Sequence, residues 1–485
     1  LLLYNQRNYD DGDQVPYRTQ GFAGRAAYTY ADRYIAEFNF GYNGSENFAK
    51  GNRFGFFPSI AAGWIVSEEE FMRPVQNYIN KLKLRASYGL AGNDRFYNDD
   101  GSQKRFAYIT TIGTTDGYKW GNSNAFYDKG GLREGDPGVE SLTWETVKKA
   151  NVGIELGLFK MAELQVDFFH ERREDIFMQR KNIPSSAGFP SAPWANYGIV
   201  TNKGFDISLD LNKQINKDWF ISARASVTYA KNKIIEQDED LGVLGTYRSS
   251  TGKPVGQIFG LVNDGLYTEA DFEDVTTGKL KPGLPVPKFS DRVYPGDIKY
   301  VDFNGDGEIT ETDKTAIGGT VNPELVYGFG INLSYKNIDF GAFFQGNGRT
   351  YRIIGENQKN FLPGSTIGAE GNIFTNASDA WTVDNPSQDV FYPRLHMGYN
   401  ANNAQVSDWW LKDMSMLRLK NVELGYSFSK NLIKKAAMEY ARIFVRGTNL
   451  LQFSKFDLWD PELNTSNGLK YPIMATYSIG LQVRF

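Results

Sequence analysis

The amino-acid sequence predicts an all-β protein, a transmembrane antiparallel up-and-down β-barrel with long extracellular loops. Three observations indicate this fold. Apolar and polar residues alternate over many long segments, the connections between these segments alternate between short and long, and no apolar run is long enough for a membrane-spanning helix. A strand with a period of two presents one face to an apolar phase and the other to a polar one, as the wall of a barrel requires.

The C-terminal segment shows the alternation most clearly. From Ile473 to Phe485 every second residue is apolar, and Met474 is the one apolar residue between them. Ending on an aromatic residue after such a strand is typical of the last strand of an outer-membrane barrel.

The segment from Trp219 to Tyr229 has the length that a membrane wall needs. Trp219 and Tyr229 lie on the same face of this strand. They are about 33 Å apart, at roughly 3.3 Å per residue. With a tilt of about 45° this gives roughly 24 Å of height, close to the ~25 Å apolar band of a membrane barrel. Strands of soluble sandwiches are about half as long, so length separates two classes that alternation alone does not.

About thirteen such strands are expected along the chain, in an up-and-down order. Their predicted bounds are 18–30, 33–44, 54–66, 81–91, 144–158, 162–174, 199–212, 219–231, 323–335, 338–347, 415–428, 438–449 and 472–485. Short connections, such as those at 31–32 and 159–161, alternate with long ones. We assign the short turns to the periplasm, which also places the C-terminus there.

An odd strand number indicates a partial barrel, because bacterial single-chain barrels have even numbers. We therefore expect residues 1–485 to be the C-terminal portion of a larger barrel, with roughly nine further strands upstream if it has the 22-stranded, plugged transporter size. Residues 232–322 would form the longest extracellular loop of this chain.

One predicted strand changes phase within its length. Leu417 and Leu419 face one way, whereas Val422 and Leu424 continue on the other parity. A β-bulge near Lys420 and Asn421 would restore a single outward face.

Composition narrows the classes of function. The 485 residues include 28 Tyr and 34 Phe, an abundance that suits aromatic girdles. There is no cysteine, so disulfides and thiol chemistry are excluded. A net charge of −4, spread along the chain, argues against nucleic acid as a partner. Mean hydropathy is low, −0.45, but alternation halves the apolar signal of a barrel.

The longest predicted loop contains the pattern of an EF-hand calcium loop. Gly307 occupies the turn position, and hard oxygen ligands are expected at positions 1, 3, 5, 7, 9 and 12. These ligands are Asp302, Asn304, Asp306, Glu308, Thr310 and Asp313. We expect a structural Ca²⁺ here, although position 12 is Asp, which is shorter than the usual Glu. The alternative is an Asx- and Gly-rich turn without metal.

No catalytic constellation is found in the sequence, so we predict that the chain is not an enzyme. His170 and His396 are the only histidines; the first lies on the apolar face of its strand and the second has no evident partner. Aromatic loop residues are candidates for ligand binding, with packing inside the loops as the alternative. They are Trp120, Trp194, Trp381, Trp409 and Trp410.

Several segments resemble one known family. Residues 144–159, 202–205, 296–307, 417–426 and 445–451, together with the closing strand, are similar to the barrel of the SusC/RagA family of TonB-dependent outer-membrane transporters of Bacteroidetes. The resemblance implies a 22-stranded, plugged barrel in the outer membrane of a Gram-negative bacterium. It also implies a SusD-like surface lipoprotein as lid, TonB as energy source, oligosaccharides or peptides as imported ligands, and a dimer of barrel–lid pairs.

The sequence departs from this family pattern because the plug, the TonB box and the early strands are not in it. A second interpretation therefore remains open, in which the chain is a SusC-like structural subunit of a larger surface or secretion assembly. An outer-membrane protease is disfavoured, since no histidine and carboxylate groups can be placed together at a barrel mouth. Neither glycan nor peptide can be chosen as substrate from the sequence.

Overall fold

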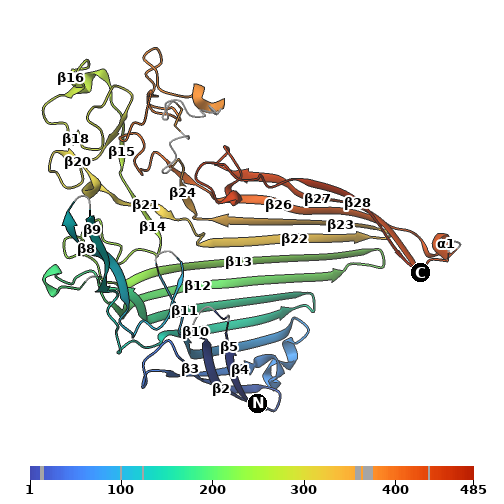
Figure 1. The fold of residues 1–485 in the computed structure, drawn as a ribbon. Coiled ribbons are helices and arrows are strands. Elements are labelled where there is room, and N and C mark those ends of the chain that lie inside the picture. The colour runs from blue at the N-terminus through green and yellow to red at the C-terminus, as the bar shows by residue number, and fades with distance from the viewer. Residues whose placement is uncertain are drawn as a thin grey trace. The chain divides into compact units, whose positions relative to one another are not determined.

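The computed structural model describes residues 1–10, 12, 16–98, 101–122, 125–189, 191–355, 362–363, 375–434 and 437–485. Fourteen long strands form one sheet, whose order follows the chain (Figure 1). They are β1 (Leu2–Tyr9), β2 (Tyr17–Tyr30), β3 (Tyr34–Ser45), β4 (Phe54–Ile65), β5 (Ile79–Asn93), β10 (Glu145–Leu158), β11 (Ala162–Gln179), β12 (Trp194–Gln214), β13 (Trp219–Glu236), β22 (Leu325–Tyr335), β23 (Ile338–Gly348), β26 (Met416–Ser427), β27 (Tyr440–Ser454) and β28 (Thr476–Arg484).

Further elements lie in the connections between these strands. The strands outside the large sheet are β6 (Phe96–Tyr97), β7 (Gln103–Lys104), β8 (Ile112–Asn122), β9 (Ala125–Glu134), β14 (Gln257–Gly260), β15 (Asn263–Leu266), β16 (Phe272–Asp274), β17 (Lys279–Leu280), β18 (Val286–Pro287), β19 (Ile298–Tyr300), β20 (Glu308–Ile309), β21 (Thr315–Thr320), β24 (Tyr351–Ile353) and β25 (Leu411–Asp413). The helical turns are η1 (Val66–Glu68), η2 (Glu70–Val75), η3 (Ser185–Ala187), η4 (Glu269–Asp271), η5 (Glu311–Asp313), η6 (Thr375–Ser378), α1 (Lys430–Ile433) and η8 (Pro461–Leu463). Within the described ranges, no helix has the length and apolar character needed to cross a membrane.

The chain divides into two compact units, which we describe separately. Unit 1 comprises residues 1–212, 228–244 and 251–253, and unit 2 comprises 213–227, 245–250 and 254–485. Neighbouring strands pair antiparallel in unit 1 from β1 to β12, and in unit 2 from β22 to β28.

The tight turns of unit 1 are those that the sequence predicted. Ala31 and Asp32 have φ of 50° and 55°, and Phe159 and Lys160 have φ of 54° and 55°. Two consecutive residues with positive φ are the mark of a two-residue type I′ turn, whose twist matches that of the strands it joins. Each turn therefore fixes the register of a long hairpin.

One face of the unit 1 strands carries the aromatic side chains expected beside lipid. Near the tight turn between β2 and β3, Tyr30, Tyr34 and Trp64 form a row across three strands, with ring centroids 6.5 and 6.4 Å apart. Residues opposite each other on antiparallel strands share a face. The row has the character of an aromatic girdle at a membrane boundary.

The opposite face of unit 1 is ionic. The carboxylate of Glu155 lies 3.0 Å from Lys81 Nζ and 3.4 Å from Arg85 Nε. Arg85 also donates to Asp167 at 2.7 Å, across three neighbouring strands. Charges concentrated on one face and aromatic rings on the other reproduce the predicted alternation of a barrel wall.

In unit 2 the predicted β-bulge is confirmed. The pairing of β26 with β27 shifts register between Leu419 and Asn421, and its pairing with β23 shifts at the same place. The extra residue, Lys420, separates the two halves of the strand, so that Leu417 and Leu424 reach the same face despite their opposite parity.

The number of predicted strands was wrong by one. All thirteen predicted segments overlap strands of the large sheet, but β1 was missed. Residues 2–9 begin with adjacent leucines and continue with polar residues on both faces, so they lack the alternation that identified the others. With fourteen strands, the odd-number argument for a missing part no longer applies.

The apolar cores of both units lie among the long connections. In unit 1, Phe48, Phe96, Leu142 and Trp144 belong to one buried cluster. In unit 2 a larger cluster surrounds Leu261, Ile298, Tyr300 and Tyr392, each at most 1% exposed. These loops are therefore packed structures, which can hold side chains in defined positions.

Candidate functional site

The predicted calcium loop forms a closed turn in unit 2. Both carboxylate oxygens of Asp302 accept backbone hydrogen bonds, from Gly305 N at 2.7 Å and from Gly307 N at 2.8 Å. The two glycines have φ of 73° and 84°, the left-handed region that glycine adopts without strain. The turn therefore requires the glycines of the pattern, whether or not a metal binds.

The other predicted ligands are also drawn into this turn. Asp313 is fully buried and accepts hydrogen bonds from Phe303 N at 2.9 Å and Thr310 N at 2.8 Å. Asn304 Nδ2 donates to Asp306 Oδ2 at 2.8 Å. These contacts organise the loop around its carboxylates.

The carboxylates of Asp302 and Asp306 keep acceptor positions that the hydrogen bonds of the loop do not use. The Glu308 carboxylate turns away to Lys288, 2.9 Å distant, which leaves its carbonyl as the expected ligand. Asp302 and Asp306 each accept two hydrogen bonds, and an ionised carboxylate offers about four lone-pair positions. In the part of the chain that the structure describes, no three His, Cys, Asp or Glu side chains are grouped to hold a metal ion. Calcium binding stays a prediction.

The five candidate tryptophans are divided between the two units, two in unit 1 and three in unit 2. Trp381 and Trp410 are 6% and 3% exposed and pack in the core of unit 2. The indole N–H groups of Trp409 and Trp410 donate to backbone carbonyls at 3.1 and 2.8 Å. Trp194 packs against the unit 1 cluster, and Trp120 is 53% exposed. Four of the five side chains therefore pack within the loops, which is the alternative that the sequence left open.

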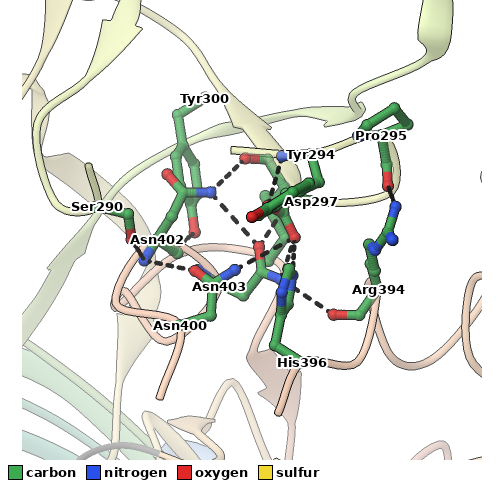
Figure 2. A network of polar contacts seen from close by, with 11 residues as sticks. Ser290, Tyr294, Pro295, Asp297, Tyr300, Arg394, His396, Asn400, Asn402 and Asn403 are labelled. Atoms are coloured by element: carbon green, nitrogen blue, oxygen red, sulfur yellow. Dashed lines mark hydrogen bonds and ion pairs between the residues drawn. The ribbon is translucent and has the colours of Figure 1, made fainter. Parts of the chain in front are cut away.

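A buried polar network that the sequence did not reveal lies in unit 2 (Figure 2). The Asp297 side chain is fully buried and forms its centre. Its Oδ1 accepts from Asn403 Nδ2 at 2.8 Å and lies 2.5 Å from His396 Nε2, while its Oδ2 accepts from Tyr294 N at 2.8 Å. The structure thus supplies the partner of His396 that sequence analysis did not find.

Two asparagines complete this network beside strand β19. Asn403 Oδ1 accepts from Ile298 N and Asn402 Nδ2 donates to Ile298 O, both at 2.9 Å. Tyr300 donates its hydroxyl proton to Asn402 O at 2.7 Å. β19 pairs with β15, and these amide side chains bond the backbone of Ile298 on the other edge of β19. The only signal in the sequence was the cluster of asparagines at 400, 402 and 403.

In unit 1, a buried carboxylate joins two other connections. Asp238 accepts hydrogen bonds from Arg180 Nε and Lys181 N, both at 2.7 Å, and from Asn182 Nδ2 at 2.8 Å. Burial by itself would raise the pKa of the Asp238 carboxyl, but these donors hold its pKa well below its usual range. The ionised carboxylate therefore stabilises the contact between the two connections.

Unit 1 also contains a cavity of about 550 Å³. It lies where β1 and β3 end and where β2 and β4 begin, at the ends of the strands opposite the turn between β2 and β3. Arg7, Arg18, Arg53, Phe106 and Tyr108 are among the residues that line it. Sequence analysis did not single out these residues, because four separate segments contribute them.

Comparison with known proteins relates this arrangement of strands and loops to one class. The chain is 30% identical to TonB-dependent receptor P26 of Formosa agariphila over 506 residues, which cover 99% of this chain and 47% of that protein. It is 25% identical to TonB-dependent receptor SusC of Bacteroides thetaiotaomicron, over 99% of this chain and 46% of SusC. The chain belongs to the SusC/RagA-type TonB-dependent receptors. No protein-family model matches it.

A solved structure of a SusC/RagA-type receptor shares the fold of the chain. The RagAB peptide importer in its open-open state matches with a TM-score of 0.72 at 23% identity, over 97% of this chain and 47% of the matched chain. The fourteen-stranded antiparallel sheet therefore corresponds to part of the barrel of such a receptor, in the outer membrane of a Gram-negative bacterium. The chain spans about half the length of the relatives it matches. The family is one of transporters and not of enzymes, as predicted.

Proposed function

We propose that this chain forms part of a SusC-like importer that takes up oligosaccharides or peptides across the outer membrane with energy from TonB. The observation that carries the proposal is the match to SusC-type receptors over 99% of the chain. The barrel wall would separate lipid from a polar interior, and the long connections would face the outside. No covalent chemistry is required of this chain.

We further propose that a SusD-like surface lipoprotein closes over the long connections. Their packed cores, centred on Phe48 in unit 1 and Tyr392 in unit 2, support this assignment, because a lid needs preformed surfaces on which to close. TonB would act through a region of the full-length protein outside these residues. The short turns and the C-terminus would then lie in the periplasm.

We keep a structural calcium ion in the loop 302–313 as part of this proposal. The ion would be held by the predicted side chains of Asp302, Asn304, Asp306, Thr310 and Asp313 and by the backbone carbonyl of Glu308. Hard oxygen ligands at this spacing suit Ca²⁺. Its role would be to stabilise the connection between β13 and β22.

Native mass spectrometry of the full-length protein, gently extracted from outer membranes, tests the importer. We expect a lipoprotein of the SusD type and a bound oligosaccharide or peptide to co-purify. Deleting tonB should abolish uptake of that ligand by cells but leave its binding unchanged. Co-purification of other surface or secretion proteins, with no lid and no ligand, would contradict the importer and favour the structural-subunit alternative.

A further inference from the structure

The aromatic face of unit 1 carries a basic cluster beyond its apolar part. Phe168, Phe205 and Tyr229 form a row on this face across β11, β12 and β13, with ring centroids 6.4 and 5.7 Å apart. Residues two positions apart on a strand share a face. Basic residues follow this row on the side away from the tight turn at 159–160. They are His170 and Arg172 on β11, Lys148 on β10, Lys203 on β12, and Lys231 and Lys233 on β13.

Strand pairing brings these side chains next to one another. His170 lies opposite Lys203, and Arg172 lies opposite Lys148. The backbone carbonyl of Lys233 accepts a hydrogen bond from a threonine hydroxyl of β12 at 3.5 Å. Residues opposite each other on antiparallel strands have Cβ atoms about 4.5–5.5 Å apart. The basic cluster is therefore one continuous patch over the neighbouring strands β10 to β13.

A carboxylate on the same face offsets only part of this positive charge. Glu174 pairs with Lys148 and lies 2.6 Å from Arg172 Nε. Lys203 and Lys233 are exposed, and neither forms an ion pair within the part of the chain that the structure describes. Like charges on residues directly opposite each other destabilise a sheet. An anion bound at the basic cluster would remove this repulsion.

The basic cluster lies at the height of a membrane boundary. Arg172 is about 33 Å along β11 from Ala162, which follows the tight turn, at roughly 3.3 Å per residue. A tilt of about 45° converts this to roughly 24 Å of height, close to the ~25 Å apolar band of a membrane barrel. Between the two residues this face carries the apolar side chains of Leu164, Val166 and Phe168. The apolar residues therefore contact acyl chains, and the basic cluster is level with lipid headgroups.

We propose that the basic cluster binds the phosphate groups of the glycolipid in the outer leaflet of the outer membrane. The inference rests on the proposed function in one respect, because long connections outside the cell place the cluster in the outer leaflet. Charge complementarity favours this partner: phosphate oxygens accept the paired N–H donors of a guanidinium and attract the ammonium groups of lysines. Lysine side chains can also extend along apolar surface to reach a headgroup.

Fluorescence titration of the full-length receptor in uncharged detergent tests this site. The probes are labelled lipid A, lipid A from which the phosphates have been removed, and phosphatidylglycerol as an anionic phospholipid. We expect lipid A to bind, and its affinity to fall by about tenfold or more when the phosphates are removed. Binding of lipid A should also weaken as the salt concentration rises, because exposed charges are screened.

A pair of charge-matched double variants separates this site from a general effect of charge. Lys203→Gln with Lys233→Gln should weaken binding of lipid A by about tenfold or more, since each cation near an anionic lipid surface contributes to binding. Lys149→Gln with Lys160→Gln removes the same charge and should leave the affinity unchanged. Lys149 lies on the other face of β10, and Lys160 lies in the tight turn. Arg172→Gln is an independent variant of the cluster, and heat-modifiable mobility shows whether each variant is folded.

Three results would overturn the proposal. They are no binding of lipid A, equal affinity with and without its phosphates, and an affinity in the folded cluster variants that equals that of the control. Tighter binding of phosphatidylglycerol than of lipid A, lost in the cluster variants, would replace the outer-leaflet glycolipid with an inner-leaflet phospholipid. It would also reverse the orientation of the barrel.

The lipid site and the importer fail in different ways. If a lid and a ligand co-purify with the receptor but the cluster variants bind lipid A as tightly as wild type, the importer stands and the lipid site falls. If no lid or ligand is found but the cluster variants lose the binding of lipid A that the control keeps, the lipid site stands and the importer falls.

Discussion

Nε2 of His396 lies 2.5 Å from Oδ1 of Asp297, a residue 99 positions earlier in the chain whose side chain is completely buried. Both residues are in unit 2. The contact joins the segment that precedes the predicted calcium loop to a segment that precedes β26. It shows that the long connections are held together by polar contacts as well as by an apolar core.

Asp297→Asn should loosen this contact locally. The new amide N–H₂ would face donors such as Asn403 Nδ2, and each lost hydrogen bond to a charged group is worth about 1.5–3 kcal/mol. We expect proteolytic cleavage within residues 394–403 to become at least about tenfold faster. Asp264→Asn is the control, because Asp264 is 64% exposed and pairs with Lys299 on the surface. Equal cleavage of the two variants would contradict the structural role.

Asp238 should make the stability of unit 1 depend on pH. Because the folded pKa of its carboxyl is lowered, its contribution is complete above the ordinary carboxyl pKa. It is lost as the pH falls through the lower folded value. Asp238→Asn should therefore reduce the free energy of unfolding by about 2–3 kcal/mol at pH 7. The difference from wild type should shrink in strong acid.

Urea unfolding in detergent at neutral and acidic pH measures this effect. Asp240→Asn changes a neighbouring exposed carboxylate and should leave the unfolding midpoint unchanged. A wild-type to Asp238→Asn difference that is constant with pH would show that the charge of Asp238 is not the stabilising feature.

Arg418 should contribute far more to the stability of the folded protein than Lys420 does. Its side chain is 3% exposed and lies 2.5 Å from Asp460 and 3.0 Å from Glu462. Arg418→Ala would leave a partly buried carboxylate without its cation, which costs about 3–5 kcal/mol. Lys420→Met breaks a more exposed pair, 3.6 Å from Glu462, and should cost about 1 kcal/mol or less. Thermal unfolding of both variants tests the contrast, and equal losses would refute it.

Deletion of Lys420 should be tolerated by the barrel. The deletion removes the extra residue of the bulge and leaves the apolar residues before and after it on one continuous face. Deleting Asn332 from β22, which has no bulge, would turn half of that strand over and place polar side chains against lipid. Heat-modifiable mobility of outer-membrane extracts distinguishes a folded barrel from an unfolded one. Loss of the folded form in the Lys420 deletion would show that the bulge itself is required.

Calcium should stabilise the loop 302–313 if the predicted ligands bind it. At a concentration about 100 times the dissociation constant, binding would add about 2.7 kcal/mol to the free energy of unfolding. The double variant Asp302→Asn, Asp306→Asn should lose this gain, and Glu311→Gln, at a position of the pattern without a ligand, should keep it. Hydrogen exchange of the loop with calcium or with chelator provides the measurement. Identical exchange in both conditions would establish a turn without metal.

The strands were predictable because their signals are local. Period-two alternation identified thirteen of the fourteen strands, and the parity change around Lys420 identified the bulge. Strand β1 was missed because its eight residues carry no alternation, and its position is set by pairing with β2. The positions of Trp381 and Trp410 could not be predicted, since burial depends on which loop segments pack around them.

The sequence by itself determined the all-β class, the two faces of each strand, the tight turns and the family, because these follow from residue patterns within a few positions. Only the tertiary structure decided that Asp297 meets His396 and that Asp238 meets Arg180. The physical reason is that such contacts join residues far apart in the chain. Their distances are set by how whole loops and strands pack, and local periodicity does not report on that packing.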